Sequence, residues 1–332
     1  MQEEFLRNAI QYIISLKFSV KCRAKEMVLD RFNRPLTGIR ISITQRCNLN
    51  CIYCHHEGER GKIQQEMSVD EIIKILKLST KFGIYKVKYT GGEPLLREDL
   101  PEIIKKSKEI SAIKEVSIVS NGILLEKFAK KLCEAKLDRI NVSLDTLNPN
   151  KYAQITNHDG TLIEQVKKGI LCALDCGITP LKLNMVLLKG INEAEVTDLI
   201  TFATEHNLIL QLIELVPAHN FHFFKKYHVN LDKIEEYLKT KAENIKIRDD
   251  QNRIKYYLIN GAEVELVKPF HNSRFCANCH RIRITSNGMI KPCLMRNDNL
   301  VDLITPLRNG ASDEVLSQIF QKAIDLREPF CK

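Results

Sequence analysis

The architecture of this chain is indicated first by the stretch Cys47-Asn48-Leu49-Asn50-Cys51-Ile52-Tyr53-Cys54. It places three thiols at i, i+4 and i+7, directly after a predicted strand at residues 38–44. A four-iron cluster normally has a cysteine thiolate on each of its irons. We therefore interpret Cys47, Cys51 and Cys54 as the ligands of a [4Fe-4S] cluster whose fourth iron is open to another molecule.

Two other interpretations fit three cysteines: a zinc knuckle, or unrelated thiols in a core, where free cysteine is commonly buried. The spacing, with the aromatic Tyr53 just before the last cysteine, instead resembles the motif of the radical S-adenosylmethionine (SAM) enzymes. That resemblance implies that SAM binds the open iron through its amino and carboxylate groups, with Tyr53 beside it.

Composition favours a metal-binding protein of a reducing compartment. The chain has 11 cysteines in 332 residues, an odd number, and no convincing leader, which argues against a secreted disulfide framework. The apolar segment 9–20 contains Gln11, Ser15 and Lys17, so it is too short and too polar to span a membrane. The formal net charge of +9 favours an anionic ligand. We expect a cytoplasmic protein.

An alternation of apolar runs and amphipathic segments predicts an α/β fold between about residues 38 and 217. Strands are expected at 38–44, 85–90, 115–119, 139–144, 181–187 and 208–215, with helices between them. The first helix begins at Ser68, which forms a capping box with Glu71. Such a pattern gives either an open doubly wound sheet or an incomplete barrel. The resemblance favours an incomplete (βα)6 barrel of the TIM type.

Three loops at the carboxyl ends of the predicted strands are candidates for the SAM site, because parallel α/β folds place their chemistry there. Thr90-Gly91-Gly92-Glu93-Pro94 alone would be an ordinary turn. One βα unit after CxxxCxxC, it resembles the segment that holds the amino end of SAM in this superfamily, with Gly92 and Glu93 as contacts. Ser120-Asn121-Gly122 and Ser143 occupy the equivalent places on the third and fourth strands.

A second cysteine motif follows a predicted hairpin at 253–267. Cys276 and Cys279 form a CxxC pair, and Cys293 follows after 13 residues. A structural zinc site would need a fourth ligand, for which His280 is the candidate. We favour a second [4Fe-4S] cluster with three cysteine ligands and an open iron.

Arg281 and Arg283 stand two residues apart beside this motif, so in a strand they point to the same side. An RxR pair is usually a solvated surface. Between cluster ligands it indicates a phosphate-binding pair, because guanidinium groups bind phosphate through bidentate, charge-assisted bonds.

With both cysteine motifs and CxRxR in order, the chain resembles the GTP 3′,8-cyclases of molybdenum cofactor biosynthesis from about Asp30 to Cys293. The resemblance implies a barrel closed by a C-terminal α+β region, with both clusters facing one cavity. It divides the chain into an extension of unclear role (1–30), a radical SAM core (31–217) and a C-terminal region with the second cluster and the GTP site (218–332). The basic positions that it implies for the GTP triphosphate are Arg40, Lys88, Lys182, Arg281 and Arg283.

The implied reaction is a radical lyase reaction of EC class 4.1.99.22. Reductive cleavage of SAM would give a 5′-deoxyadenosyl radical that abstracts hydrogen from C3′ of GTP, so that C3′ adds to guanine C8. The product is 3′,8-cyclo-7,8-dihydro-GTP, and no side chain acts as acid or base in the abstraction. The resemblance also implies an electron donor such as flavodoxin or ferredoxin and, downstream, cyclic pyranopterin monophosphate synthase. It leaves a homodimer open and gives no role to nucleic acid.

Several positions differ from the family pattern. Gln211 stands where arginine is frequent, Val119 where threonine is frequent, and Lys88 replaces a common arginine. The C-terminus lacks a double glycine, and Met27 is an alternative translation start. Of the remaining cysteines, we expect Cys172 and Cys176 to pack in a helix, whereas Cys22, Cys133 and Cys331 have no partner in the sequence pattern.

Two other functions remain in view. A radical SAM maturase acting on a peptide or protein would usually carry more C-terminal cysteines and would lack the Arg281 and Arg283 pair. A zinc-dependent nucleic-acid-binding protein would need stacking aromatics or a basic stripe. This chain has no tryptophan and its charge is dispersed.

Overall fold

Strand–helix units in succession form the first part of the fold, seen in a computed structural model that describes residues 28–59, 65–217 and 221–331. The strands are β1 (Gly38–Ser42), β2 (Lys86–Thr90), β3 (Glu115–Ser120), β4 (Arg139–Ser143), β5 (Leu181–Leu187) and β6 (Ile209–Glu214). The helices are α2 (Val69–Thr80), α3 (Leu100–Lys108), α4 (Leu125–Glu134), α5 (Pro149–Thr156), α6 (Leu162–Asp175) and α7 (Val196–Glu205), with 3-10 turns η1 (His56–Gly58), η2 (Pro94–Leu96) and η3 (Glu193–Glu195). Neighbouring strands from β1 to β6 pair in parallel, as helical crossovers require.

The C-terminal part of the chain adds strands to both ends of this sheet. Its strands are β7 (Ala242–Ile247), β8 (Ile254–Leu258), β9 (Glu263–Val267), β10 (Arg281–Ile284), β11 (Met289–Lys291) and β12 (Val301–Asp302). Its helices are α8 (Phe221–Tyr227), α9 (Asp232–Lys241), α10 (Ser273–Ala277), α11 (Ile304–Arg308) and α12 (Asp313–Asp325), with the turn η4 (Asp250–Asn252). Strand β10 pairs in parallel with β1, and β9 with β6. The order is β12-β11-β10-β1-β2-β3-β4-β5-β6-β9-β8-β7.

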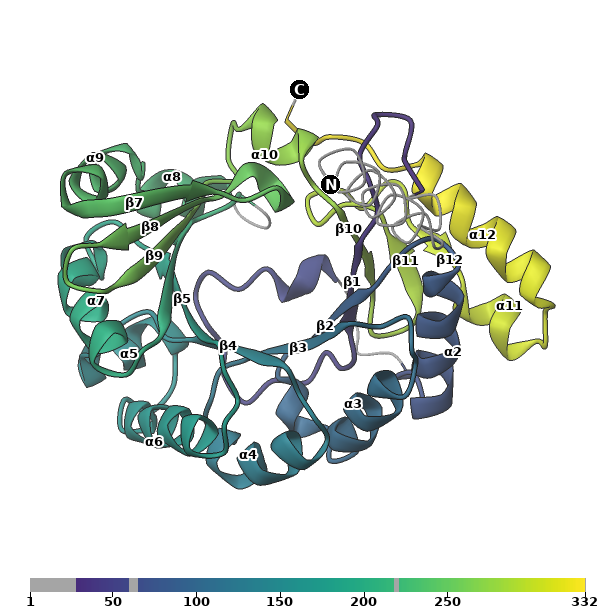
Figure 1. Cartoon of the computed structure of the whole chain (residues 1–332), viewed down its shortest axis with the longest axis horizontal. Helices are drawn as coiled ribbons and strands as arrows, with labels where there is room; N and C mark the ends of the chain where they lie inside the picture. The colour runs from purple at the N-terminus through teal and green to yellow at the C-terminus, as the bar shows by residue number, and fades with distance from the viewer. Residues whose placement is uncertain (1–27, 60–64, 218–220, 332) are drawn as a thin grey trace, which may run out of the picture.

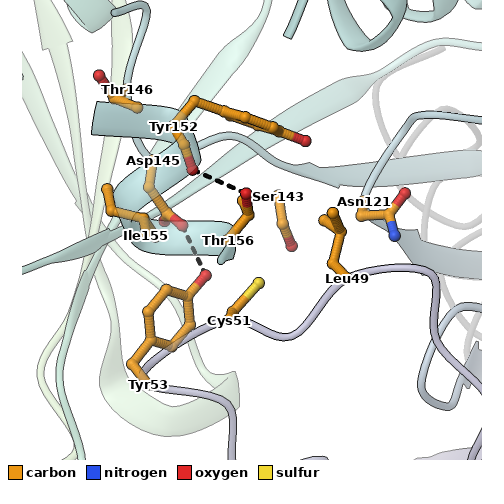
Figure 2. Close-up of a pocket in the computed structure, with 10 residues that line it drawn as sticks. All are labelled: Leu49, Cys51, Tyr53, Asn121, Ser143, Asp145, Thr146, Tyr152, Ile155 and Thr156. Atoms are coloured by element: carbon orange, nitrogen blue, oxygen red, sulfur yellow. Dashed lines mark hydrogen bonds between the residues drawn. The ribbon is translucent and has the colours of Figure 1, made fainter. Parts of the chain in front are cut away.

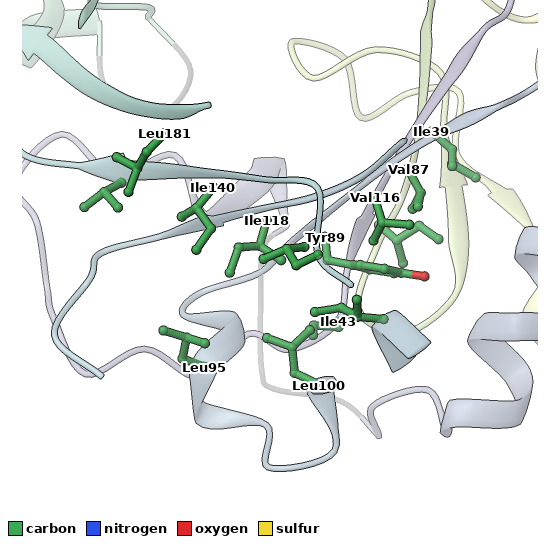
Figure 3. Close-up of a cluster of buried hydrophobic side chains, with 14 of the residues drawn as sticks. Ile39, Ile43, Val87, Tyr89, Leu95, Leu100, Val116, Ile118, Ile140 and Leu181 are labelled. Atoms are coloured by element: carbon green, nitrogen blue, oxygen red, sulfur yellow. The ribbon is translucent and has the colours of Figure 1, made fainter. Parts of the chain in front are cut away.

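The two faces of the curved sheet differ in chemistry because side chains alternate along each strand. The sheet bends around a central space, and the helices that link its parallel strands lie on the outside (Figure 1). The outer face is apolar: Ile118 and Ile140 are fully buried and lie above Leu95 and Leu100 (Figure 3). The inner face carries charged and amide side chains. They are Arg283, Arg40, Lys88, Asn141, Lys182, Gln211 and Glu265.

Helix α2 begins where the sequence predicts. The Glu71 amide donates to Ser68 Oγ at 3.2 Å, and the Ser68 amide donates to Glu71 Oε2 at 2.8 Å. This capping box satisfies two backbone donors at the helix start. Ile72, Ile75 and Leu76 then lie fully buried on one side of the helix.

The core of the fold agrees with the expectations from the sequence. The α/β class and each expected strand from 38–44 to 208–215 are confirmed, and the expected hairpin is the antiparallel pair β8–β9. The closure of a barrel by the C-terminal region stays a prediction. Most of the N-terminal extension, with the alternative start Met27, lies outside the described residues. In the described ranges, no helix has the length and apolar character needed to cross a membrane.

A core substitution tests the packing of the outer face. Ile140→Ala removes a fully buried side chain, whereas Ile259 is 73% exposed. We expect Ile140→Ala to lower the free energy of unfolding by about 2–5 kcal/mol, because transfer energy is lost and a cavity is left. Ile259→Ala serves as the control and should change it by less than about 0.5 kcal/mol. Urea unfolding of the apoprotein measures both, and equal effects would contradict the assigned faces.

Candidate active site

The loop that carries the first cysteine motif rests on the glycine turn after β2. The Gly92 amide donates to the Thr44 carbonyl at 2.8 Å. A Cβ on Gly91 would lie 2.4 Å from the Thr44 carbonyl oxygen, and one on Gly92 would lie 2.2 Å from that of Arg46. Neither distance admits a side chain, so both glycines are needed for the turn to reach the backbone that leads into Cys47.

Glu93 joins this turn to the one after β3. Its buried carboxylate accepts hydrogen bonds from Ser120 Oγ (2.8 Å), the Asn121 amide (2.6 Å) and the Leu95 amide (3.0 Å). Burial raises the pKa of Glu93 to about 7, against the effect of these donors. Asn121 Nδ2 in turn donates to Asn48 Oδ1 in the cysteine loop, at 2.7 Å. Glu93 therefore braces the loop, and its contact with SAM stays a prediction.

A pocket opens between the cysteine loop, the ends of β3 and β4, and helix α5 (Figure 2). It is lined by Leu49, Cys51, Tyr53, Asn121, Ser143, Asp145, Thr146, Tyr152, Ile155 and Thr156. Three of the residues predicted from the sequence, Cys51, Tyr53 and Ser143, thus meet in one pocket. Gly92 and Glu93 are not among its lining residues but contact the loops that form it.

The Tyr53 hydroxyl fixes the cysteine loop to the end of β4. It donates to Asp145 Oδ2 at 2.6 Å (Figure 2). The Val186 amide donates to Asp145 Oδ1 at 2.7 Å. Burial raises the pKa of Asp145 to about 6, although both donors oppose the shift. The buried Tyr152 hydroxyl has no hydrogen-bond partner among the described residues. Tyr152 therefore offers an unsatisfied polar group to a ligand in this pocket.

The chemistry of the three loop thiols fits a metal cluster. Burial raises the pKa of Cys51, and the charges of Asp145, Cys54 and Cys47 raise it further. Burial also raises the pKa of Cys47 and of Cys54. Thiols that disfavour each other's ionisation are stabilised as thiolates by iron, since the thiolate is the metal ligand. Within the described ranges, however, no trio of Cys, His, Asp or Glu side chains is already gathered in ligating geometry.

The second cysteine motif lies at the start of β10. Cys276 is in α10, and burial raises the pKa of Cys293, an effect that the charge of Cys279 increases. Cys331, for which the sequence pattern offers no partner, also contacts this motif: its backbone amide donates to Cys276 Sγ at 3.4 Å. The sequence could not show this contact, since the C-terminal segment reaches Cys276 only after the chain has folded.

Arg40 and Arg283 are neighbours on the inner face, paired in register between β1 and β10. Glu57, three residues after Cys54, accepts from Arg40 Nη1 at 3.2 Å and from Arg283 Nη1 at 2.6 Å. Burial would raise the pKa of Glu57, yet Arg40 and Arg283 together lower it to about 2. Burial lowers the pKa of Arg40 to about 10, against the effect of Glu57. Glu57 therefore connects the first cysteine loop to the strand that follows the second motif.

Lys88 is a partly buried cation with a neutral hydrogen-bond partner. Its Nζ donates to Asn141 Oδ1 at 2.9 Å, and Asn141 Nδ2 donates to Gln211 Oε1 at 2.9 Å. Burial lowers the pKa of Lys88 well below its usual value, and the nearby charges of Arg139 and Arg40 lower it further. An anion beside Lys88 would reverse this penalty.

Lys182 and two arginines surround Glu265. Lys182 Nζ donates to Glu265 Oε2 at 2.6 Å, while Arg248 and Arg253 contact Glu265 Oε1, each at 3.0 Å. Burial lowers the pKa of Lys182 to about 8, against the effect of Glu265. Burial would raise the pKa of Glu265, yet the Arg253 charge, followed by that of Lys182, holds it far below its usual range.

Arg281 completes this set of cations. Arg281 Nη2 lies 2.9 Å from Asp250 Oδ2, and Arg253 Nη2 lies 3.2 Å from the same oxygen. Arg281 also contacts the side chain of Gln251. The five basic residues predicted from the sequence are thus all placed on the inner face, near three carboxylates.

The structure adds residues that the sequence analysis did not propose. Arg248 and Arg253 reach the inner face from the segments around η4, and Glu57, Asp250 and Glu265 supply the opposing charge. Glu265 lies at an inward-facing position of a strand in the predicted hairpin. An acidic residue at such a position was the signal by which the sequence could have identified it. Arg248 and Arg253 follow no motif.

Two family models match the chain. The model of the radical SAM superfamily matches residues 41–203, and the model described as "Molybdenum Cofactor Synthesis C" matches residues 208–332. The first contains the Cys47 motif and the second contains the Cys276 motif. The two matches together extend over nearly all of the described chain.

Curated relatives match along almost their whole length. A protein of Methanococcus aeolicus named "Probable GTP 3′,8-cyclase" is 46% identical over 305 residues, 91% of this chain and 99% of the relative. A protein of Thermococcus kodakarensis with the same name is 44% identical over 312 residues, 92% of this chain and 100% of the relative. Among solved structures, Streptococcus suis SuiB bound to S-adenosylmethionine has a TM-score of 0.63 at 17% identity, covering 96% of this chain and 72% of SuiB. The likeness to SuiB shows a shared fold.

Gly92→Ala tests the contact between the glycine turn after β2 and the cysteine loop. Its Cβ would meet the Arg46 carbonyl at 2.2 Å, whereas a Cβ on Gly38 would have no neighbour closer than 3.8 Å. We expect Gly92→Ala to destabilise the protein by about 1–3 kcal/mol through overpacking. It should also lower the amount of iron that the protein binds, because it displaces the loop that carries Cys47, Cys51 and Cys54. Iron analysis and urea unfolding, with Gly38→Ala as control, measure the effects; unchanged iron in Gly92→Ala would refute this account of the turn.

Proposed function

Because the chain belongs to the GTP 3′,8-cyclase family of radical SAM enzymes, we propose that it converts GTP to 3′,8-cyclo-7,8-dihydro-GTP. This is the first step of molybdenum cofactor biosynthesis, in agreement with the second family model. The observation that carries the proposal is the row of cations on the inner face, of which Lys182 is buried and the other four are partly buried. Two of them, Arg40 and Arg283, pair in register on β1, which leads into the first cysteine motif, and β10, which follows the CxxC pair.

Cys47, Cys51 and Cys54 would hold the cluster that binds SAM, and Cys276, Cys279 and Cys293 would hold a second one. When bound, the first cluster and SAM supply the 5′-deoxyadenosyl radical. The residues of this chain have the task of orientation. Tyr53 and Asp145 fix the loop at the pocket, and Ser143 and the unpaired Tyr152 hydroxyl offer polar groups to SAM.

The triphosphate of GTP fits the inner face because of its charge. Arg40, Lys88, Lys182, Arg281 and Arg283 would bind its oxygens, with charge-assisted hydrogen bonds from the guanidinium groups. In the free protein, Glu57, Asp250 and Glu265 hold four of these cations through ion pairs. A polyanion would take over part of this pairing. The cations are thus already in place before GTP binds, which reduces the entropic cost of orientation.

The difference at position 211 is consistent with this site. Gln211 lies opposite Glu265 in the register of β6 and β9, so an arginine is absent where the family frequently has one. Arg253 contacts Glu265 from the neighbouring hairpin and supplies a cation near the same place. We assign Arg253 to this site as a replacement for that charge.

The second cluster would bind the guanine side of GTP through its open iron. Burial raises the pKa of Cys293 and the charge of Arg283 opposes this shift, which supports a position of β10 within electrostatic reach of this motif. The curved inner face would hold GTP between the two motifs and keep water from reactive intermediates. A donor such as flavodoxin or ferredoxin would supply the electron, and cyclic pyranopterin monophosphate synthase would use the product.

An anaerobic activity assay tests the function. Protein purified or reconstituted without oxygen should hold about eight irons per chain, four in each cluster. With reductant and SAM it should form 5′-deoxyadenosine at a rate that rises strongly when GTP is added, together with the cyclised nucleotide. Formation of 5′-deoxyadenosine at the same rate with and without GTP would contradict the cyclase function. A colourless protein with stoichiometric zinc would contradict both clusters.

The pH dependence of GTP binding tests the role of Lys182. Its pKa in the free protein is lowered to about 8, so the cation is present below pH 8 and is lost as the pH rises above it. Binding of a triphosphate raises this pKa again, so affinity should fall by up to about tenfold per pH unit above pH 8. Lys182→Arg keeps its charge and should weaken this dependence. Anaerobic calorimetry from pH 7 to pH 9.5 measures both, and identical slopes would exclude Lys182 from the triphosphate site.

Arg283→Met tests the phosphate-binding pair. It removes a cation that lies 2.6 Å from Glu57 on the inner face, while Arg308→Met removes one from an exposed pair with Glu71. We expect Arg283→Met to raise the KM for GTP at least about tenfold, since a charged hydrogen bond contributes about 1.5–3 kcal/mol. Arg308→Met should leave KM within twofold. An unchanged KM in Arg283→Met would place the triphosphate elsewhere.

A further inference from the structure

A buried group of three charged side chains lies behind the second cysteine motif. Asp30 Oδ2 accepts from Arg34 Nε at 2.8 Å and lies 3.2 Å from Arg327 Nη1. The side chains of Asp30, Arg34 and Arg327 are 0%, 5% and 1% exposed. We call these residues the Asp30–Arg34–Arg327 triad. Two guanidinium groups and one carboxylate leave it with a net charge of +1.

A further donor of each arginine binds the backbone of the CxxC pair. Arg34 Nη1 donates to the Cys276 carbonyl at 3.1 Å, and Arg327 Nη2 donates to the Cys279 carbonyl at 2.5 Å. Each arginine therefore connects the shared carboxylate to one of the two cysteines. An ion pair that served only to stabilise the fold would not need each arginine to contact a different cysteine of the CxxC pair.

The C-terminal segment makes a further contact with the same motif. The Cys331 amide donates to Cys276 Sγ at 3.4 Å, four residues after Arg327. The Arg327 amide bonds to the Ile324 carbonyl at 3.0 Å, so Arg327 directly continues the end of α12. The start of the described chain and its end thus both reach the loop of Cys276 and Cys279.

Charge near an iron–sulfur cluster changes its reduction potential, as do hydrogen bonds to the sulfurs. Reduction adds negative charge, and a buried positive group stabilises the reduced form more than an exposed one because the local dielectric constant is low. Burying an arginine is costly unless it is paired and fully hydrogen-bonded. In the triad, Asp30 pairs with both arginines, and the two cysteine carbonyls accept further hydrogen bonds from them.

We propose that Arg34 and Arg327 are positioning residues of the second cluster: they hold Cys276 and Cys279 by their carbonyls, and their net charge raises the reduction potential of the cluster. This rests on the two-cluster function proposed above. This role is distinct from GTP binding, because the charged groups of the triad pair with one another and with the carbonyls of the CxxC pair.

The test uses full-length protein with Cys47, Cys51 and Cys54 changed to alanine, so that the second cluster alone gives a signal. Arg327→Met takes the triad from +1 to 0, and Asp30→Asn takes it to +2. In an EPR-monitored redox titration, Arg327→Met should lower the midpoint potential and Asp30→Asn should raise it. A tenfold change in the ratio of reduced to oxidised cluster, on the order expected here, corresponds to about 59 mV for one electron.

The opposite directions of the two potential shifts distinguish an effect on the reduction potential from an effect on folding. Both substitutions remove partners of a buried ion pair, so both should lower the melting temperature, whereas a structural effect gives no reason for potentials that move apart. Arg327→Lys keeps the charge and should stay near the wild-type potential. If Arg327→Met does not fold, the midpoint potentials of Asp30→Asn and Arg327→Lys are compared instead. The potential of Asp30→Asn should then be the higher of the two. Arg308→Met, at an exposed pair with Glu71, is the unaffected control.

Two results would overturn the proposal. One is a wild-type potential in both Arg327→Met and Asp30→Asn at full iron content, and the other is a shift of both in the same direction. Failure of the two-cluster function itself has a different readout. Reconstituted wild-type protein would then hold about four irons per chain instead of about eight, and the triple alanine variant would hold none.

Discussion

The alternation of side chains along parallel strands is the constraint on which the rest of the molecule depends. Ile39, Val87 and Ile140 must face the helices, and this fixes the register of β1, β2 and β4. A slip of one residue would bring Arg40 and Lys88 into the apolar layer under the helices. The hydrophobic effect on the outer face therefore holds the cations of the inner face in place, although it acts on none of them directly.

The inner face carries a concentration of positive charge that the protein tolerates through acidic partners. Glu57 is shared by Arg40 and Arg283, and Glu265 by Lys182 and Arg253. The positive charge of the inner face is not fully neutralised by these pairs. Lys88 has an amide as its hydrogen-bond partner, and its pKa is strongly lowered. The free protein thus retains unfavourable electrostatic energy that a polyanion relieves. This energy favours a triphosphate over a neutral ligand of the same shape.

The two cysteine motifs are distant in sequence but connected by charged contacts. Glu57 follows the first motif and binds Arg283 after the second, across 226 residues. Arg34 reaches Cys276 across 242 residues. Strand β10 pairs with β1, so the second motif lies beside the strand that leads into the first. The sheet order alone brings the two halves of the candidate site together.

The sequence by itself determined the α/β class of the fold, the two cysteine motifs and the strand phase that brings the basic residues to the inner face. Cysteine spacing, the capping box at Ser68 and the phase of Lys88 in its strand are local patterns, because they depend on a few neighbouring residues. Only the tertiary structure decided the partners: Glu57 with Arg283, Arg253 with Glu265, and Arg327 with Cys279. The reason is that no local pattern encodes contacts between residues far apart in the chain. They follow from the strand order and from how the C-terminal segment packs against the start of β1.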